Sequence, residues 1–326
     1  MVNAITVLSG ADLSALMRFG DYVDCVAEAF RLHAEGRSLL PDPMHIPAEG
    51  GGFHVKAASL ALSNGYVAVK TNSNFPDNRK RGLPTIQGAI LLFDAGGALL
   101  ALIDSIEITS KRTGAATAVA ARYLARPESR TATICGCGAQ GRVQLEALRH
   151  GLDLRRVFVF DRDAAAAETF ATELARQGLD AEVPAALRAA ALESDVVVTC
   201  TTARMAYLGI ADVRPATFIA AIGADNPEKS EIEPALMAKA RVVTDVRSLC
   251  AVMGDLHHAI HAGAMSDRDV HADLGELVAG RRPGRMSSDE ITLFDGCGVG
   301  IQDVAAAAQA YQLARERGLG ARISLS

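Results

Sequence analysis

Hydrophobic residues along the middle of the chain follow two alternating spacings. Short apolar runs, each about the length of a strand, occur at 131–135, 156–160, 195–201, 217–222 and 241–244. Ala-rich segments with helical spacing, such as 164–177 and 184–192, lie between them. Stretches such as VVVTC are apolar at every position, which is typical of strands covered by helices on both faces. The pattern predicts a doubly wound α/β domain with a parallel sheet over roughly residues 120–295.

The first 115 or so residues follow another pattern. A helical segment at 11–33 precedes three strand-like stretches, GGFHVKAASL, GYVAVKTNSNF and TIQGAILLFDAGGALLALID, with turn sequences at Asn64-Gly65 and Gly96-Gly97. This order predicts an α+β domain. The Ala-rich segment near the C-terminus predicts a last helix, and we expect 301–326 to pack back on the first domain. The predicted division is 1–118 for the first domain and 119–300 for the second.

A glycine-rich turn follows the first strand of the second domain, in TICGCGAQGRVQLEAL. Gly136, Gly138 and Gly141 have the spacing of a dinucleotide-binding turn, in which they allow a tight turn, the approach of a pyrophosphate and close helix packing, respectively. The helix N-terminus that follows favours an anion. The next strand ends in Asp161, whose carboxylate can accept hydrogen bonds from an adenosine ribose. A turn that serves packing alone is the alternative interpretation.

The residues near Asp161 bear on which nicotinamide cofactor would bind. A carboxylate repels a 2′-phosphate, whereas Arg162, the next residue, can attract one. The pair therefore favours NAD, with NADP possible. We also assign Thr201 and Gly223, near the ends of two later strands, to the cofactor site.

Three charged residues stand out in otherwise apolar or small-residue segments. Lys70 shares one strand face with Tyr66 and Ala68, and is either a functional lysine or a solvated edge lysine. Arg112 is predicted at the start of a helix, where it can hold a carboxylate or form a surface salt bridge. Asp225 follows an apolar strand, at the sheet edge where ligands of α/β proteins bind; a turn or N-cap role is its alternative.

Other polar residues give weaker signals. His54 and Lys56 share a strand face by alternation and are candidates for the same pocket as Lys70. Three histidines of one predicted helix, at 257, 258 and 261, lack a further ligand nearby and are taken as ordinary helix residues. Cys135 and Cys137 lack a second cysteine pair or a histidine at metal-binding spacing, so we predict no metal site.

The composition narrows the class of protein. A chain of 326 residues, 49% hydrophobic and 22% charged, is long enough for two globular domains. Its net charge of −5 and its scattered basic residues argue against nucleic-acid binding and favour a small-molecule partner. We expect a cytoplasmic protein with no membrane contact and reduced cysteines, since no signal peptide, long apolar stretch or disulfide framework is apparent.

Several segments together resemble the ornithine cyclodeaminase / mu-crystallin family over nearly the whole chain. They are, in order, VAVKTNSNFPDN, GLPTIQGAILLFD, EITSKRTGAATAVAARYLA, ICGCGAQG, SDVVVTCTTA, IGADNPEKSEIEP and ITLFDGCGVGIQDVAAAA. The resemblance implies a Rossmann-type NAD(P)-binding domain and an α+β domain for substrate binding and dimerisation. It also implies a homodimer built through the first domain and an active site between the domains.

The resemblance assigns roles to individual residues. The active-site lysine of the family falls on Lys70, its carboxylate-binding arginine on Arg112 and its acid/base aspartate on Asp225. The nucleotide-binding residues fall on Gly136, Gly138, Ala139, Gln140 and, at the ribose, Asp161. Many members have a second arginine where this chain reads PDPMHIP, so Lys56 is a candidate to replace it. His54 stands near the position of a glutamate of the cyclodeaminases, and DGCGVGIQD is closer to the dehydrogenase and imine-reductase branches.

These features predict an NAD(P)H-dependent imino-acid reductase or amino-acid dehydrogenase. Arg112 would hold the substrate carboxylate, while Lys70 and Asp225 would handle protons at the substrate nitrogen. Ornithine cyclodeaminase, which recycles its NAD and releases ammonia, is the alternative. A dimer that binds nucleotide without turnover is a third possibility, against which the presence of all three residues argues.

Overall fold

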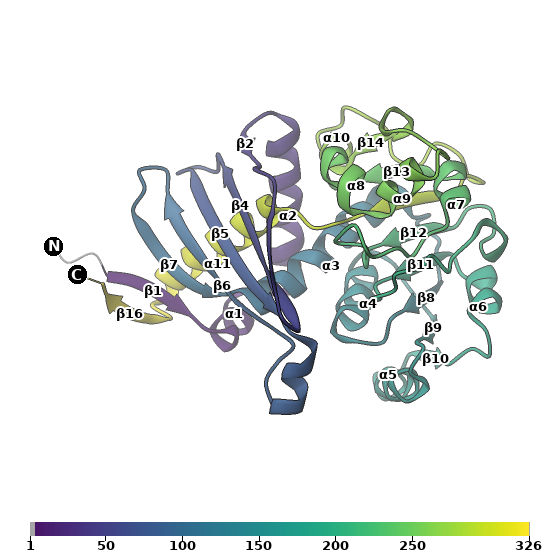
Figure 1. The fold of residues 1–326 in the computed structure, drawn as a ribbon, viewed down its shortest axis with the longest axis horizontal. Coiled ribbons are helices and arrows are strands. Elements are labelled where there is room, and N and C mark those ends of the chain that lie inside the picture. The colour runs from purple at the N-terminus through teal and green to yellow at the C-terminus, as the bar shows by residue number, and fades with distance from the viewer. Residues whose placement is uncertain (1–3, 326) are drawn as a thin grey trace. The chain divides into compact units, whose positions relative to one another are not determined.

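The computed structural model describes residues 4–325, and the chain divides into two compact units. Unit 1 takes in the chain up to Ala115 and again from Val299 onward, and unit 2 runs from Ala116 to Gly298. The first boundary falls inside helix α3 (Ser105–Leu124), and the second lies just before α11 (Gly300–Arg317). Figure 1 shows both units with their elements labelled. Unit 1 is thus completed by the last helix of the chain.

Unit 1 is built on an eight-stranded sheet. The order is β16-β1-β7-β6-β5-β4-β2, with β3 paired to β4. Its strands are β1 (Ala4–Leu8), β2 (Ser38–Leu39), β3 (Met44–Ala48), β4 (Gly51–Leu60), β5 (Tyr66–Asn74), β6 (Ile86–Asp94), β7 (Leu99–Asp104) and β16 (Ala321–Ser324). Helix α11 lies along β4, β5 and β6 and also packs on α2 (Phe19–Ala34), as Figure 1 shows. One face of the sheet is therefore covered by helix.

The two ends of the chain differ from the sequence-based expectation. The helical segment at 11–33 is two helices, α1 (Gly10–Leu16) and α2, because Met17 and Arg18 are extended. Strand β1, before α1, was not predicted. The expected last helix is found as α11, but it does not extend over the whole of 301–326, since it ends at Arg317 and Gly318 adopts a left-handed conformation with φ of 66°. The chain then returns as β16, antiparallel to β1.

Unit 2 is a doubly wound domain, as predicted. Its eight strands are all parallel and lie in the order β10-β9-β8-β11-β12-β15-β13-β14. They are β8 (Thr131–Cys135), β9 (Arg156–Phe160), β10 (Asp180–Glu182), β11 (Val196–Thr199), β12 (Phe218–Ala221), β13 (Arg241–Thr244), β14 (Ala272–Asp273) and β15 (Thr292–Asp295). The strand order reverses at β8 and β11, and ligands of such sheets bind at the carboxyl ends beside this reversal.

Short helices connect the strands of unit 2. The α-helices are α4 (Ala139–Gly151), α5 (Ala164–Arg176), α6 (Leu187–Glu193), α7 (Pro234–Lys239), α8 (Arg247–Met253), α9 (Asp255–His261) and α10 (Leu274–Val278). Single 3₁₀ turns lie at Pro76–Arg81 in unit 1 and at Ile210–Asp212 and Asp267–Asp269 in unit 2. Among the described residues, none of the helices has the length and apolar character needed to cross a bilayer.

Candidate functional site

The structure requires glycine at two of the three positions of the turn after β8. Gly136 has a φ of +108°, and a Cβ there would lie 2.8 Å from the carbonyl oxygen of Cys200. A Cβ on Gly141 would overlap the carbonyl oxygen of Gly136, so helix and turn can approach only without it. Gly138 differs, because its φ is −82° and a Cβ would meet no protein atom within 4 Å. The described fold gives no steric reason for glycine at 138.

The N-terminus of α4 is open beside this turn. Gly138 is its N-cap and, among the described residues, no side chain caps the helix, so backbone N–H groups of its first turn are available to an anion. Arg142, in the first turn of α4, fixes the glycine turn by donating to the carbonyl oxygens of Cys137 (2.6 Å) and Gly138 (3.2 Å). Its guanidinium also pairs with Glu173 at 2.8 Å through both Nε and Nη2. The turn is held in place by contacts within unit 2.

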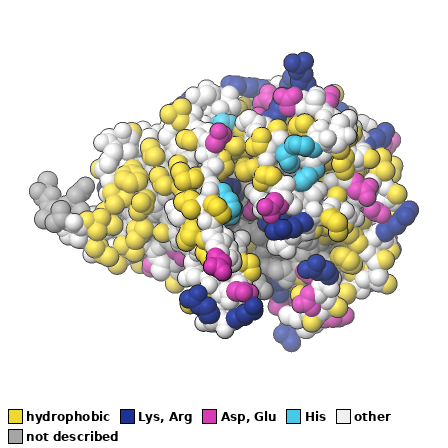
Figure 2. All heavy atoms as spheres, in the orientation of Figure 1, with side chains coloured by type: hydrophobic (Ala, Val, Ile, Leu, Met, Phe, Trp, Pro, Cys, Tyr) yellow, Lys and Arg dark blue, Asp and Glu magenta, His cyan; other side chains and the backbone are white. Residues whose placement is uncertain are grey.

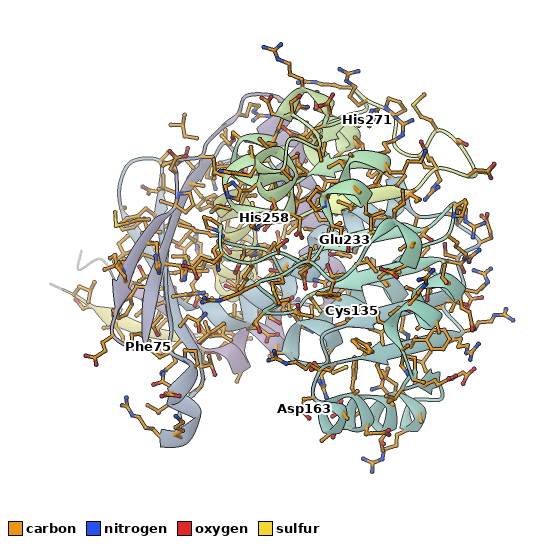
Figure 3. All side chains as sticks on the ribbon, turned by 45° about the vertical axis from the view of Figure 1, so that its right-hand side comes forward. Phe75, Cys135, Asp163, Glu233, His258 and His271 are labelled. Carbon is orange, nitrogen blue, oxygen red and sulfur yellow. The ribbon has the colours of Figure 1, made fainter. Side chains whose placement is uncertain are left out.

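Asp161 is tied to the glycine turn across the sheet edge. Its Oδ2 accepts the Cys137 N–H at 2.8 Å and its Oδ1 accepts the Asp163 N–H at 2.9 Å. Asp163 caps α5 by accepting from Ala165, and Figure 3 shows it at the start of that helix and Cys135 at the end of β8. Arg162 between them is exposed. The carboxylate therefore stands next to the open helix end, with the arginine on the surface beside it.

We expect Asp161→Ser to shift cofactor preference from NADH towards NADPH. Serine removes the charge that repels a 2′-phosphate and leaves Arg162 to attract it. The ratio of kcat/KM for the two cofactors should change by about tenfold or more. Asp163→Ser, a change two residues away that keeps a helix-capping side chain, should leave the ratio unaltered. An unchanged ratio in Asp161→Ser would show that this residue does not contact the ribose.

A buried glutamate joins the carboxyl ends of β11 and β12. Glu231 is fully buried, and its Oε1 accepts from the N–H (2.7 Å) and the hydroxyl (2.6 Å) of Thr201. The Tyr207 hydroxyl donates to the same oxygen at 3.0 Å, and the Gly223 N–H donates to Oε2 at 2.8 Å. The predicted cofactor residues Thr201 and Gly223 thus share one carboxylate, which the sequence analysis did not single out.

Asp225 lies two residues beyond Gly223, at the carboxyl end of β12. Its side chain is about half exposed and its Oδ1 accepts from Lys229 Nζ at 2.7 Å and from Asn226 at 3.3 Å. It caps none of the described helices. The carboxylate is therefore paired with a lysine and accessible to a ligand.

Lys70 is buried within unit 1, with only 3% of its surface exposed. Its Nζ lies 2.6 Å from Oδ2 of Asp303, on α11, and 3.3 Å from the hydroxyl of Thr109, on α3. Tyr66, Ala68 and Lys70 are buried while the residues between them are more exposed. Of the two possibilities left open by the sequence, the structure shows the buried lysine rather than a solvated edge lysine.

Arg112 joins the same cluster. It is 4% exposed, donates from Nε to Asp303 at 3.2 Å and from Nη1 to Gln302 at 2.6 Å. The expectation that Arg112 opens a helix is wrong. Helix α3 starts at Ser105, because Asp104 accepts the N–H groups of residues 106 and 107 and so caps it. The cationic group is held by two side chains of α11 rather than by a helix dipole.

The charges in this cluster shift the pKa of its members. Burial lowers the pKa of Lys70 to about 7, against the attraction of Asp303, and the nearby Arg112 and Lys56 lower it further. Burial alone would raise the pKa of Asp303, but Lys70, Arg112 and Lys56 bring it below its ordinary value. Burial is thus the main cause of the lowered pKa of Lys70, whereas the surrounding positive charges are the cause of the lowered pKa of Asp303. A pKa of about 7 leaves Lys70 able to exchange a proton near neutral pH.

His54 and Lys56 lie on the same sheet face as Lys70. The register pairs Lys56 with Lys70 and His54 with Asn72 across β4 and β5. The His54 ring stacks on His45 of β3 with 4.6 Å between centroids. Both positions are half-buried, so they flank the buried cluster on one side.

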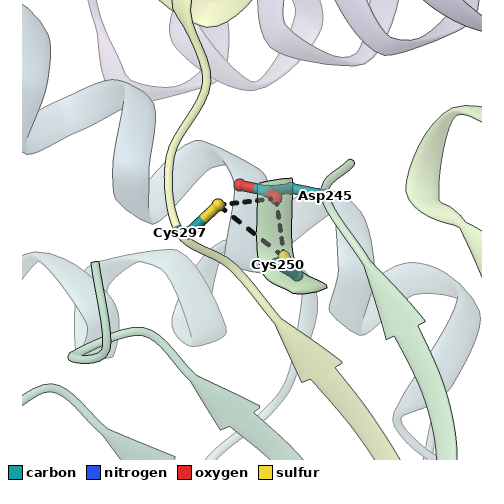
Figure 4. A group of neighbouring side chains, drawn as sticks. All are labelled: Asp245, Cys250 and Cys297. Carbon is teal, nitrogen blue, oxygen red and sulfur yellow. Dashed lines mark hydrogen bonds between the residues drawn. The ribbon is translucent and has the colours of Figure 1, made fainter. Parts of the chain in front are cut away.

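Two cysteines and one aspartate form a closed group in unit 2, shown in Figure 4. Cys250 and Cys297 donate to Oδ1 of Asp245 at 3.2 and 3.4 Å, and their sulfur atoms lie 3.7 Å apart. The same carboxylate accepts the N–H groups of Val246 and Gly298. These hydrogen bonds account for the grouping without a metal ion. The absence of a metal stays a prediction.

Four residues of these two sites were missed by sequence reasoning. They are Arg142, Glu231, Gln302 and Asp303. The last three are polar residues that become buried in an apolar or Ala-rich setting, and Gln302 with Asp303 interrupts an otherwise apolar stretch from Gly300 to Ala308. Two adjacent polar residues on a helix that is buried on all sides are the signal that could have identified Gln302 and Asp303.

Comparison with known proteins shows which family the chain belongs to. The chain is 36% identical over 318 residues to the alanine dehydrogenase of Archaeoglobus fulgidus, covering 97% of each chain. A solved structure of an archaeal alanine dehydrogenase dimer with bound NAD matches with a TM-score of 0.94 at 35% identity, covering 99% of this chain and 100% of that one.

A second solved structure is the Δ1-pyrroline-2-carboxylate reductase of Thermococcus litoralis in complex with NADH and L-proline. It matches with a TM-score of 0.93 at 32% identity, covering 98% of this chain and 100% of that one. The family model described as ornithine cyclodeaminase/mu-crystallin matches residues 4–318. The chain therefore belongs to the ornithine cyclodeaminase/mu-crystallin family.

Proposed function

We propose that the protein is an NAD(H)-dependent oxidoreductase that interconverts a small α-imino acid and the corresponding α-amino acid. The buried ionic cluster of Lys70, Asp303 and Arg112 carries this proposal, because burying three charges is costly unless they act on a ligand or fully satisfy one another. The alanine dehydrogenase and the pyrroline-carboxylate reductase to which the chain is similar both interconvert an imine or ketone with an amine.

The residues of the glycine turn fit a dinucleotide. Gly138 leaves open space where a Cβ would stand, and the N-terminus of α4 has no side-chain cap. These residues would hold the pyrophosphate, and Asp161 would hold the ribose. When bound, the nicotinamide supplies or accepts a hydride. Because the reaction draws on the cellular nicotinamide pool, we place it in the cytoplasm.

Arg112 would bind the substrate carboxylate. Among the described residues its Nε and Nη1 are hydrogen-bonded to α11, while no such bond involves Nη2. The guanidinium is thus fixed in place with donors left for an anion. A substrate carboxylate there would also offset the positive charge that Lys70, Arg112 and Lys56 leave over beside Asp303.

Lys70 would transfer the proton. In the reductive direction the imine carbon gains a hydride and the nitrogen gains a proton, so the charged ammonium of Lys70 acts as the acid and becomes neutral. In the oxidative direction the neutral amine takes that proton back. A pKa of about 7 allows both steps near neutral pH. Asp225, which is accessible, would act as a second proton carrier.

An assay that follows NADH and ammonia separately tests this function. We expect one NADH to be consumed for each amino acid formed, with pyruvate plus ammonium or with five- and six-membered cyclic ketimine carboxylates as substrates. Ammonia released from ornithine without any net change in NADH would instead establish a cyclodeaminase. NADH binding without turnover of any of these substrates would identify a non-catalytic binding protein.

We also propose that two copies associate through unit 1, as the resemblance implied. The sheet face opposite Lys70 is apolar and only partly covered within one chain. It carries Phe53, Val55, Ala57, Val67, Val69, Leu91, Phe93 and Leu102. Phe53 is 37% exposed and Leu91 36%, and Figure 2 shows hydrophobic side chains gathered over the strands of unit 1. A contiguous apolar face of this kind favours a protein partner, and the similar archaeal structure is a dimer.

A further inference from the structure

We propose that Glu231 is a positioning residue, which fixes the carboxyl ends of β11 and β12 so that Thr201 and Gly223 are presented to the nicotinamide half of the cofactor. The inference rests on the proposed function only for its effect on turnover, since its effect on NADH binding needs no substrate. It explains why a carboxylate is buried in unit 2 with no cationic partner among the described residues.

The side chain bridges two neighbouring strands. Oε1 accepts three hydrogen bonds, two from Thr201 after β11 and one from Tyr207, and Oε2 accepts the Gly223 N–H after β12. The four distances lie between 2.6 and 3.0 Å. The two segments are also joined by the exposed Arg204–Glu228 ion pair at 3.0 Å and by backbone hydrogen bonds, and β11 and β12 stay paired up to Thr199 and Ala221. Removing the Glu231 carboxylate would therefore take the common acceptor away from Thr201 and Gly223 while the strands themselves stay paired.

The charge of Glu231 is held by neutral donors. In the described part of the chain it makes no ion pair, and its relative exposure is 0%. Burial raises the pKa of Glu231, while the hydrogen bonds from Thr201 and Tyr207 counter that rise. A buried acceptor with no cation depends on every donor, because each lost hydrogen bond costs the full desolvation of the oxygen. The geometry of the two loops is thus coupled to one side chain.

The bonds restrict what Thr201 can offer a ligand. Its single hydroxyl proton is donated to Glu231, and its oxygen accepts the Ala203 N–H at 3.1 Å. The remaining lone pair can accept a hydrogen bond, but the hydroxyl has no proton left to donate. This arrangement suits a ligand group that donates, such as the amide of a nicotinamide.

Gly223 is restricted by the same carboxylate. A Cβ at this position would overlap Glu231 Oε2, so only glycine brings the backbone N–H within hydrogen-bonding distance. The carbonyl oxygen of Gly223 in turn accepts the Asp225 N–H at 3.1 Å. The position of Glu231 therefore also sets the start of the segment that carries the proposed proton carrier Asp225.

The backbone of Glu231 is also fixed by hydrogen bonds. Its N–H donates to Oδ1 of Asp255 at 2.8 Å, and its carbonyl oxygen accepts the N–H groups of Tyr207 and Leu208. Asp255 belongs to α9, and its own N–H donates to Asp295 at the end of β15. These hydrogen bonds connect Glu231 through α9 to the end of a third strand, β15, and so fix its position, as a positioning residue requires.

Glu231→Gln tests the inference. An amide cannot accept on both sides, so either the Gly223 N–H or the Thr201 donors lose their acceptor. We expect the dissociation constant for NADH, measured by fluorescence titration, to rise by about tenfold. With a turned-over substrate, the primary deuterium isotope effect from deuterated NADH should also increase, because poorer alignment makes hydride transfer slower relative to other steps. Tyr207→Phe, which removes one donor only, should show the same changes to a smaller extent.

Asp195→Asn is the matched control. Asp195 is also a buried carboxylate at an end of β11, but at the amino end, where it accepts from Arg126, Arg214 and two backbone N–H groups. The substitution Asp195→Asn should lower Tm without changing NADH affinity or the isotope effect. Wild-type NADH affinity in both Glu231→Gln and Tyr207→Phe would overturn the inference, whatever the substrate proves to be. So would equal losses of affinity in Glu231→Gln and Asp195→Asn, which would reduce Glu231 to a general stability residue.

Discussion

Gly138→Val is expected to lose NADH binding while keeping its fold. The φ of −82° at this position is ordinary for valine, and a Cβ would meet no protein atom within 4 Å. The isopropyl group would instead occupy the space through which a pyrophosphate reaches the N–H groups of α4. Affinity for NADH should fall by about 100-fold or more, and Tm without ligand should stay close to wild type.

The other glycines of the turn provide the contrast. Gly141→Ala should lower Tm, because its Cβ would overlap the carbonyl oxygen of Gly136 in the folded protein. Any loss of NADH binding there would be secondary to that strain. If Gly138→Val bound NADH as tightly as wild type, the nucleotide would have to bind elsewhere.

Lys70→Met should have the largest effect on turnover. Methionine keeps much of the length and removes the proton, so kcat in the reductive direction should fall by about 100- to 10,000-fold, with NADH affinity little changed. The pH dependence has a defined sign. Lys70 must be charged to donate a proton, so wild-type kcat for reduction should decrease as the pH rises through about 7, and kcat for oxidation should decrease as it falls through the same value.

Both pH-dependent decreases in kcat should be absent from the residual activity of Lys70→Met. Lys239→Met, at an exposed position at the end of α7, controls for the loss of a lysine and should retain the wild-type profile. Should Lys70→Met keep the pH dependence near 7, another group would be the proton carrier, and Asp225 would be the first to examine.

The glycine turn and the position of Asp161 beside it could be predicted because their determinants are local in sequence. The turn, the helix start and the acid that ends the next strand occur within one β-α-β unit. The need for glycine at 141 comes from Gly136 in the same unit, whereas a Cβ on Gly136 would meet Cys200, which follows β11. The strand at 131–135 is found at the same residues in the structure. Local pattern and final fold agree here because each strand is buried on both faces.

The lysine cluster could be predicted only in part. Alternation placed Lys70 on one face of β5 but could not tell which face is covered, because the covering helix α11 comes from the other end of the chain. Asp303 and Gln302 gain their roles only when that helix packs on the sheet. The position of Arg112 within its helix was also predicted wrongly. The capping residue, Asp104, is the last residue of β7, so the strand runs directly into α3 and no break in the pattern marks the start of the helix.

The late arrival of α11 has a consequence for how the protein is made. A ribosome synthesises the sheet strands of unit 1 up to β7 first, then all of unit 2, and only then the helix that covers the Lys70 face. Unit 2 is one continuous stretch of chain and can fold as soon as it emerges, whereas the nascent unit 1 exposes its inner apolar face throughout that time. Asp303, the partner of the buried lysine, is therefore synthesised near the end of the chain, so the apolar face of the unit 1 sheet stays uncovered until synthesis is almost complete.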